Sequence, residues 1–312
     1  MNENELVARA RELFSSKIGD DAAVVGEQVI TTDMLVEDVD FTRAVPLPLI
    51  ARKSLAVNLS DIAAMGARPS HAVVAIGLPE WARDGVDAIM VALRDAAKEW
   101  KIEIVGGDFS RADKLVISIA AVGRIEERPL LRSGAKPGDR IFLSRPIGGS
   151  AAGLHLLSRN LDALSFTQRE FARSAIDRQL DPQPEIDLGL ALVRIREVTA
   201  CIDVSDGLST DLHHLCDASR CGAEIDRERI PIFPDLINLG PALGVRVQDA
   251  VLNGGEEYAL LFTASLRESE LSARLKRAVY AIGKITSGPE IVIREEGVTR
   301  PLEARGWDHF AR

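Results

Sequence analysis

Residues 46–66 read PLPLIARKSLAVNLSDIAAMG, and this stretch decides how we expect the chain to fold. Pro46 and Pro48 at its beginning and Gly66 at its end are start and stop signals of a long helix. Apolar residues occupy most sides of that helix, so we expect it to be buried nearly all round instead of on a single face.

One narrow polar stripe runs along the same helix. Ser54, Asn58 and Asp61 follow the spacing i, i+4 and i+7, which places them on one side. A buried stripe of oxygen-bearing side chains suits Mg²⁺ ligation, but a satisfied hydrogen-bond network would have the same pattern. Both interpretations stay open from these residues alone.

Helical and extended patterns alternate on either side of this helix. Upstream, we expect a short amphipathic helix near residues 4–14 and a β-hairpin around Gly26. Downstream, the patterns predict a strand at 71–78, a helix at 83–100, a short strand ending at Val105 and a long strand at 114–125.

The segment RSGAKPGDR, residues 132–140, has the composition of a crossing between domains. Beyond it the patterns predict strands at 141–144, 201–204, 257–263 and 279–285, and helices at 148–157, 166–177, 184–198 and 205–219. The alternation favours an α/β (α+β) architecture. With 312 residues, we expect two domains, 1–135 and 136–312.

Composition and charge exclude several classes of protein. The chain has 38 basic and 47 acidic residues, and the net charge of -9 disfavours nucleic-acid or anionic-membrane partners. Its three cysteines, Cys201, Cys216 and Cys221, form no C-x-x-C pair, so neither a disulfide framework nor a zinc site is indicated. The N-terminal residues lack a signal-peptide pattern and no apolar run reaches the ~20 residues of a membrane span. We therefore expect a cytoplasmic protein.

Several carboxylates stand where predicted strands end in turns. They follow Val, Ile or Gly, where burial makes an unpaired anion costly, and convergence on a hard cation would offset that cost. Oxygen ligands without sulfur suit Mg²⁺, Mn²⁺ or Ca²⁺, and Mg²⁺ on carboxylates usually accompanies phosphate chemistry. Nucleotide use is the leading interpretation. The residues concerned are Asp20, Asp21, Asp33, Asp108, Asp203 and Asp206.

A phosphate-binding loop is harder to find. The chain has no P-loop, no kinase-type glycine loop and no dinucleotide fingerprint. The best candidate is PIGGSAAGL, residues 146–154, where Ser150 stands at a predicted helix start; a plain helix cap is the alternative. Arg132 could contact phosphate or be a solvated charge, and Trp307 could stack on a planar ring or cover a core.

Nine motifs in this order resemble the thiamine-monophosphate kinases along the whole chain. These kinases belong to the ATP-binding superfamily of aminoimidazole ribonucleotide synthetase, selenophosphate synthetase and a hydrogenase maturation enzyme. The motifs are IGDDAAVV, TTDMLVEDVDF, ARKSLAVNLSDIAAMGARP, VGGD, RSGAKPGDRIFLS, GGSAAGL, IDVSDGLSTDLHHL, NGGEEYALLFT and GWDHF.

The resemblance implies a two-domain aminoimidazole ribonucleotide synthetase-like fold whose N-terminal domain pairs across a homodimer. It also implies transfer of the γ-phosphoryl group of ATP to thiamine monophosphate, with Mg²⁺ and without a covalent nucleophile. Carried over by motif, the metal ligands would be Asp20, Thr31, Thr32, Asp33, Asp61, Asp108, Asp203 and Asp206. Gly107, Arg132 and Ser205 would contact ATP, and Glu256 and Trp307 would face the substrate.

The chain departs from the family pattern on the substrate side. Asp40 stands where a substrate-facing histidine is expected. Phe109 replaces a small polar residue, Gly149 replaces an acid, and Gln179 and Glu185 stand where His and Arg are common. Two alternatives remain, namely an ATP-dependent enzyme of the same superfamily with another small substrate, and a non-catalytic nucleotide-binding protein. Selenophosphate synthetase is disfavoured because no cysteine precedes Cys201.

Overall fold

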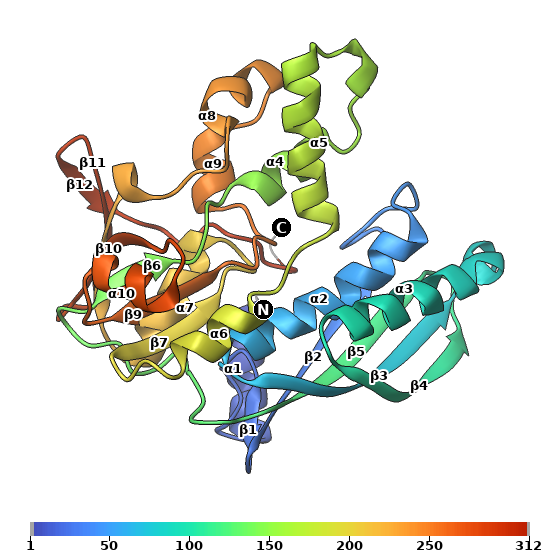
Figure 1. Ribbon diagram of the computed structural model, residues 1–312, viewed down its shortest axis with the longest axis horizontal. Coiled ribbons are helices and arrows are strands. Elements are labelled where there is room, and N and C mark those ends of the chain that lie inside the picture. Colours follow the sequence, from blue (N-terminus) through green and yellow to red (C-terminus); the bar gives the residue numbers. More distant parts are fainter. Residues whose placement is uncertain (1–2, 311–312) are drawn as a thin grey trace.

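The computed structural model describes residues 3–310, which form two β-sheets with helices packed against them (Figure 1). The first sheet has the strand order β1-β2-β5-β3-β4. Only β3 and β4 are parallel; the other neighbours are antiparallel. Its strands are β1 (Ala23–Val25), β2 (Gln28–Val36), β3 (Arg68–Leu78), β4 (Glu103–Arg111) and β5 (Val116–Arg124).

Helix α2 (Leu47–Ala64) is the buried helix that the sequence predicts. It packs on one face of the first sheet beside α3 (Val86–Glu99), and its other side contacts α6 (Ile186–Leu192) and β7 (Val198–Asp203) (Figure 1). Because two layers cover it, apolar residues on nearly all its sides are shielded from water. This helix joins the two halves of the chain.

The second sheet has the order β12-β11-β8-β10-β6-β9-β7 and is mixed. Its remaining strands are β6 (Arg140–Leu143), β8 (Gly222–Asp226), β9 (Leu260–Ala264), β10 (Tyr280–Thr286), β11 (Ile291–Glu295) and β12 (Val298–Pro301). The remaining helices are α1 (Glu3–Leu13), α4 (Gly149–Leu156), α5 (Phe166–Leu180), α7 (Leu208–Ser219), α8 (Leu236–Leu239), α9 (Val247–Leu252) and α10 (Glu268–Leu275). Four short 3₁₀ segments are η1 (Glu80–Gly85), η2 (Leu161–Ala163), η3 (Arg227–Arg229) and η4 (Pro241–Leu243).

The predicted α/β (α+β) class is confirmed, and some elements differ from expectation. Strand β4 does not end at Val105 but continues through the glycine pair to Arg111. At Gly107 the strand lies so close to β3 that a Cβ atom would come within 1.9 Å of the Val74 carbonyl oxygen. Helix α6 is shorter than predicted, because the chain turns after Leu192 to enter β7. Strands β8, β11 and β12 were missed, since they are short and carry charged residues.

Across residues 3–310, every helix is too short or too polar to cross a lipid bilayer.

Candidate active site

Three carboxylates from distant parts of the chain meet where the two halves join. Asp21 precedes β1, Asp61 lies on α2 and Asp203 ends β7, and each offers an oxygen within 4.8 Å of the others. Hydroxyl donors support two of them: Thr31 Oγ1 donates to Asp61 at 2.5 Å, and Ser60 Oγ donates to Asp203. We call these three residues the carboxylate group.

Burial and mutual repulsion disfavour the ionised forms of the carboxylate group and of Asp33. Burial raises the pKa of Asp203 to about 8, and the charge of Asp21 contributes. Burial raises the pKa of Asp33 to about 6, with further contributions from Asp40 and Asp21, and raises that of Asp61 well above its usual value. Crowded buried carboxylates suit a hard divalent cation, which would neutralise the repulsion.

One oxygen of Asp21 has no hydrogen-bond partner. Asp21 is buried, and its Oδ1 accepts from the Arg132 guanidinium at 2.7 and 3.1 Å, whereas its Oδ2 is buried and unsatisfied. A buried unpaired carboxylate oxygen costs free energy, and a cation would satisfy it. The donor set therefore fits Mg²⁺.

The carboxylate group contains Asp21, whereas the motif predicts Asp20 as a metal ligand. The Oδ1 atom of Asp20 accepts the backbone N–H of Arg132 at 3.0 Å, so this side chain anchors the crossing between the halves. Burial, followed by the charge of Asp21, raises the pKa of Asp20 to about 6. The two acids are adjacent in sequence, and their contacts distinguish them: Asp20 accepts the backbone N–H of Arg132, and Asp21 accepts from its guanidinium.

The polar stripe of α2 divides between the two interpretations given above. Ser54 Oγ donates to the Ala51 carbonyl, Asn58 Nδ2 donates to the Ser54 carbonyl, and Asn58 Oδ1 accepts the Asp33 N–H. These two residues form a satisfied hydrogen-bond network, and only Asp61 joins the carboxylate group.

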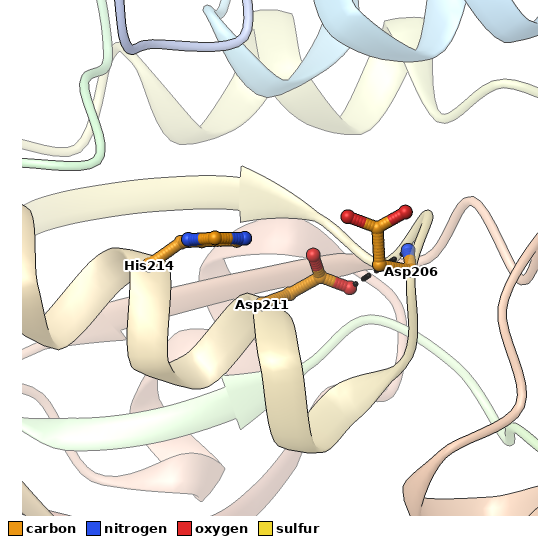
Figure 2. A group of neighbouring side chains, drawn as sticks. All are labelled: Asp206, Asp211 and His214. Carbon is orange, nitrogen blue, oxygen red and sulfur yellow. Dashed lines mark hydrogen bonds between the residues drawn. The ribbon is translucent and has the colours of Figure 1, made fainter. Parts of the chain in front are cut away.

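A second group, drawn in Figure 2, contains Asp206, Asp211 and His214 at the start of α7, with one ligand atom from each within 4.8 Å of the others. Asp211 Oδ2 accepts the backbone N–H groups of Asp206 and Gly207 at 3.2 and 3.0 Å, so it caps the turn. Burial, followed by the charge of Arg132, lowers the pKa of His214 to about 4. Asp206 is among the acids expected from the sequence, whereas Asp211 and His214 are not, although their i, i+3 spacing places both on one side of α7.

Thr32 and Asp108 lie apart from both groups. Thr31 and Asp33 of β2 face α2, so Thr32 between them points to the opposite, exposed face of the sheet. Asp108 is exposed on β4, in register with Ala75, and accepts a hydrogen bond from Ser110 Oγ at 2.9 Å. Within this chain, the structure does not bring these two residues to the carboxylate group.

A cavity of about 110 Å³ lies between the halves, lined by residues 35–53 of one and 154–180 of the other. Asp40 lines it and is half-buried, so this carboxylate is not turned to solvent. Its Oδ2 accepts the Val36 N–H at 2.7 Å. Burial raises its pKa, while that hydrogen bond and the charge of His309 act in the opposite direction.

Glu256, from the C-terminal half, contacts two residues of the cavity lining, Lys53 and Gln179. It accepts a hydrogen bond from Gln179 Nε2 and pairs with Lys53 Nζ at 2.6 Å. Its segment packs tightly against Ser205, because a Cβ atom on Gly255 would lie 2.5 Å from the Ser205 carbonyl oxygen, and the Glu256 N–H donates to that oxygen at 2.6 Å. Glu256 itself has a left-handed backbone with φ of 60°, a strained conformation often found at functional sites.

The predicted phosphate cradle at Ser150 is wrong in this structure. The backbone N–H groups of Gly148 and Ser150 donate to Glu257 Oε1 at 2.7 and 2.9 Å, so the helix start already binds an anion of the chain itself. Gly149, where the family pattern has an acid, has no room for a side chain, since a Cβ atom would lie 2.5 Å from the Phe233 ring. The helix begins at Gly149 without a side-chain cap of its own, and Ser150 Oγ donates to Gln179 instead.

Glu185, another departure from the family pattern, is compensated within the chain. It is buried and pairs with Arg277 at 2.6 Å and with Arg145 at 3.6 Å. An acid in place of the usual arginine is therefore neutralised by two arginines. Phe109, by contrast, is 57% exposed on β4.

The C-terminal segment lies beside the second group. The backbone N–H of Trp307 donates to the Asp206 carbonyl oxygen at 2.9 Å. The Trp307 indole is 54% exposed and meets the His309 ring edge-on, with ring centres 5.7 Å apart. The indole is thus available for stacking and does not cover a core.

Comparison with known proteins gives first the class. Residues 19–125 match the family described as AIR synthase related protein, N-terminal domain, and residues 136–295 match the corresponding C-terminal domain. The chain belongs to this class of proteins, as its fold and buried carboxylates suggest.

Relatives then define the family within that class. The thiamine-monophosphate kinase of Bacillus subtilis is 34% identical over 309 residues, covering 94% of this chain and 93% of its own, and that of Escherichia coli K12 is 35% identical, covering 94% and 91%. A solved structure described as AaThiL complexed with AMPPCP and TMP has a TM-score of 0.88 and 32% identity, covering 99% and 97%. This chain belongs to the thiamine-monophosphate kinase family.

Proposed function

We propose that this protein transfers the γ-phosphoryl group of ATP to the phosphate of thiamine monophosphate, giving thiamine diphosphate and ADP. The observation that carries this proposal is the buried carboxylate group to which both halves contribute. A related structure whose name includes AMPPCP and TMP supports the choice of both substrates.

Mg²⁺ is the proposed cofactor. Asp21, Asp61 and Asp203 would hold it, with Asp33 and Asp206 as further ligands, and it would supply charge neutralisation to the phosphates. Support comes from the unsatisfied Asp21 oxygen and the raised pKa values of Asp33 and Asp203. We infer direct in-line transfer, since the site offers carboxylates and no activated nucleophile.

The residues of the chain have distinct proposed roles in this reaction. Arg132, oriented by Asp21, would contact ATP together with Ser205 and Gly107. Glu256 and Asp40 would orient the substrate, and Trp307 would stack on its rings. Excluding water from the cavity strengthens each of these polar contacts.

We further propose a cytoplasmic homodimer with domains at 1–135 and 136–312. The two sheets share no strand, which supports the division. The face of the first sheet opposite α2 exposes Ile30, Met34 and Val73, an apolar surface suited to a second copy. Three free buried cysteines suit a reducing compartment.

The decisive assay incubates the purified protein with ATP, Mg²⁺ and thiamine monophosphate, and measures ADP and thiamine diphosphate. Thiamine, which has no phosphate to accept the group, is the control substrate. ADP formation that depends on thiamine monophosphate supports the proposal. Equal ADP formation with both compounds, or none with either, would overturn it.

A further inference from the structure

Lys53 is a buried lysine with no role in the function proposed so far. It lies on α2 with 4% exposure, and it is the one lysine among residues 5–310 that is buried. Burying an ammonium group is costly unless a partner compensates it. A lysine retained at this position therefore needs a reason beyond packing.

The partner of Lys53 is Glu256, which also contacts a second residue of the cavity lining, Gln179. The Lys53 Nζ atom lies 2.6 Å from Glu256 Oε1, and the other oxygen of Glu256 accepts from Gln179. Glu256 remains 27% exposed at its side chain, so the pair lies at the boundary of the cavity and not in a sealed core. Lys53 carries three N–H donors, and the structure assigns this one carboxylate to them.

Lys53 also lines the cavity between the two halves. Lys53, Asp40 and Gln179 are polar members of a lining that otherwise contains mainly apolar residues, including Leu154 and Leu157. Such a lining suits a ligand with an apolar ring and an anionic group. Lys53 is the one cationic side chain in the lining, so an anionic group of a ligand would be directed to it.

The pair also lies within electrostatic range of the metal-binding side of the site. Burial raises the pKa of the Tyr258 phenol, and the charges of Glu256, Asp33, Asp203 and Asp61 raise it further. Lys53 and Asp61 are eight positions apart on α2, about 12 Å along its axis.

We propose that Lys53 binds the phosphate of the acceptor substrate, and that Glu256 holds the ammonium group in place until the phosphate replaces it. The ligand class is the phosphate monoester of a heteroaromatic alcohol. This inference rests on the proposed function and identifies the residue that binds the substrate phosphate in the same cavity. The carboxylate of Glu256, released from Lys53, is then free to face a cationic ring of the substrate.

The test compares two ligands that differ only in the phosphate. Dissociation constants of thiamine monophosphate and of thiamine are measured by calorimetry for the wild type, Lys53→Met and Lys53→Arg, with Lys98→Met as an exposed-lysine control on α3. We expect Lys53→Met to weaken thiamine monophosphate binding about 10- to 100-fold and to leave thiamine binding within about twofold. Lys53→Arg should restore most of the loss, and Lys98→Met should match the wild type.

Other outcomes have distinct meanings. Equal losses for both ligands, with a lowered melting temperature, would make Lys53 a structural residue and overturn the inference. Unchanged binding of thiamine monophosphate would overturn it directly. Lys53→Met could fail to fold because it leaves the Glu256 carboxylate unpaired. In that case the double variant Lys53→Met/Glu256→Gln is compared with Glu256→Gln alone. A loss of affinity for thiamine monophosphate but not for thiamine then supports the inference, and equal affinities overturn it. Absence of turnover in the wild type would refute the proposed function, while the phosphate-dependent binding difference still tests Lys53.

Discussion

Replacing Asp61 with Asn should stabilise the metal-free protein and reduce what Mg²⁺ adds to its stability. Asp61 has two carboxylate neighbours, Asp21 and Asp203, with oxygens within 4.8 Å. At that distance and an effective dielectric constant of about 20, each ionised pair repels by about 3.5 kcal/mol. Asparagine keeps the oxygen that accepts from Thr31 and removes the charge.

Proton binding reduces part of this repulsion, so the expected gain depends on pH. The pKa values of Asp203 (about 8) and Asp33 (about 6) lie above their usual value of 3.8, so the folded metal-free protein binds protons that the unfolded chain has lost. The stability that these two groups contribute is therefore fully present below about pH 4 and is lost as pH rises to about 8. Near pH 8 the variant should gain about 1 to 3 kcal/mol, and near pH 5 almost nothing.

Thermal melts with a chelator, near pH 8 and near pH 5, measure this effect. A gain of 1 kcal/mol corresponds to about 1.5 °C for a chain of this size. Added Mg²⁺ should then raise the melting temperature of Asp61→Asn less than that of the wild type. Asp95→Asn, an exposed acid on α3 paired with Arg94, is the control.

Two results would refute the reasoning. If Asp61→Asn melts several degrees lower than both the wild type and Asp95→Asn near pH 8 without metal, Asp61 stabilises the apo protein and is not repelled within it. If Mg²⁺ stabilises the variant as much as the wild type, Asp61 is not a metal ligand.

Three further expectations concern catalysis. Asp33→Asn should lower turnover at least ~100-fold, equivalent to ~2.7 kcal/mol of transition-state stabilisation, and steady-state kinetics showing wild-type turnover would remove Asp33 from the site. Labelled ATP should leave no phosphorylated protein after rapid quenching, because direct transfer needs no covalent intermediate, and a trapped phospho-enzyme would contradict this. Asp40→His should lower KM for thiamine monophosphate, because a carboxylate ~6 Å from the substrate phosphate repels it by ~2.8 kcal/mol at a dielectric constant of ~20. Screening should leave ~1.4 kcal/mol of this repulsion, which corresponds to a tenfold change in affinity. A higher KM would instead indicate that Asp40 pairs with the cationic ring.

The sequence was sufficient for the features that depend on local pattern. The apolar residues around residues 46–66 predicted a buried helix, and α2 is buried between two layers. Ordered motifs predicted the family, and the carboxylates at strand ends and on the buried helix included Asp61 and Asp203, which the structure brings together. The hairpin around Gly26 followed from its turn residue in the same way.

Only the tertiary structure could decide which of these side chains meet. Asp20 and Asp21 are neighbours in sequence, yet one caps a backbone N–H and the other joins carboxylates at positions 61 and 203. The amides around Ser150 resemble a phosphate site until Glu257, more than a hundred residues away, occupies them. Lys53 looks like any helix lysine until packing buries it against Glu256. Local sequence determines which groups a segment offers, but long-range packing determines their partners, and the partner decides whether an anion or cation is left available for a ligand.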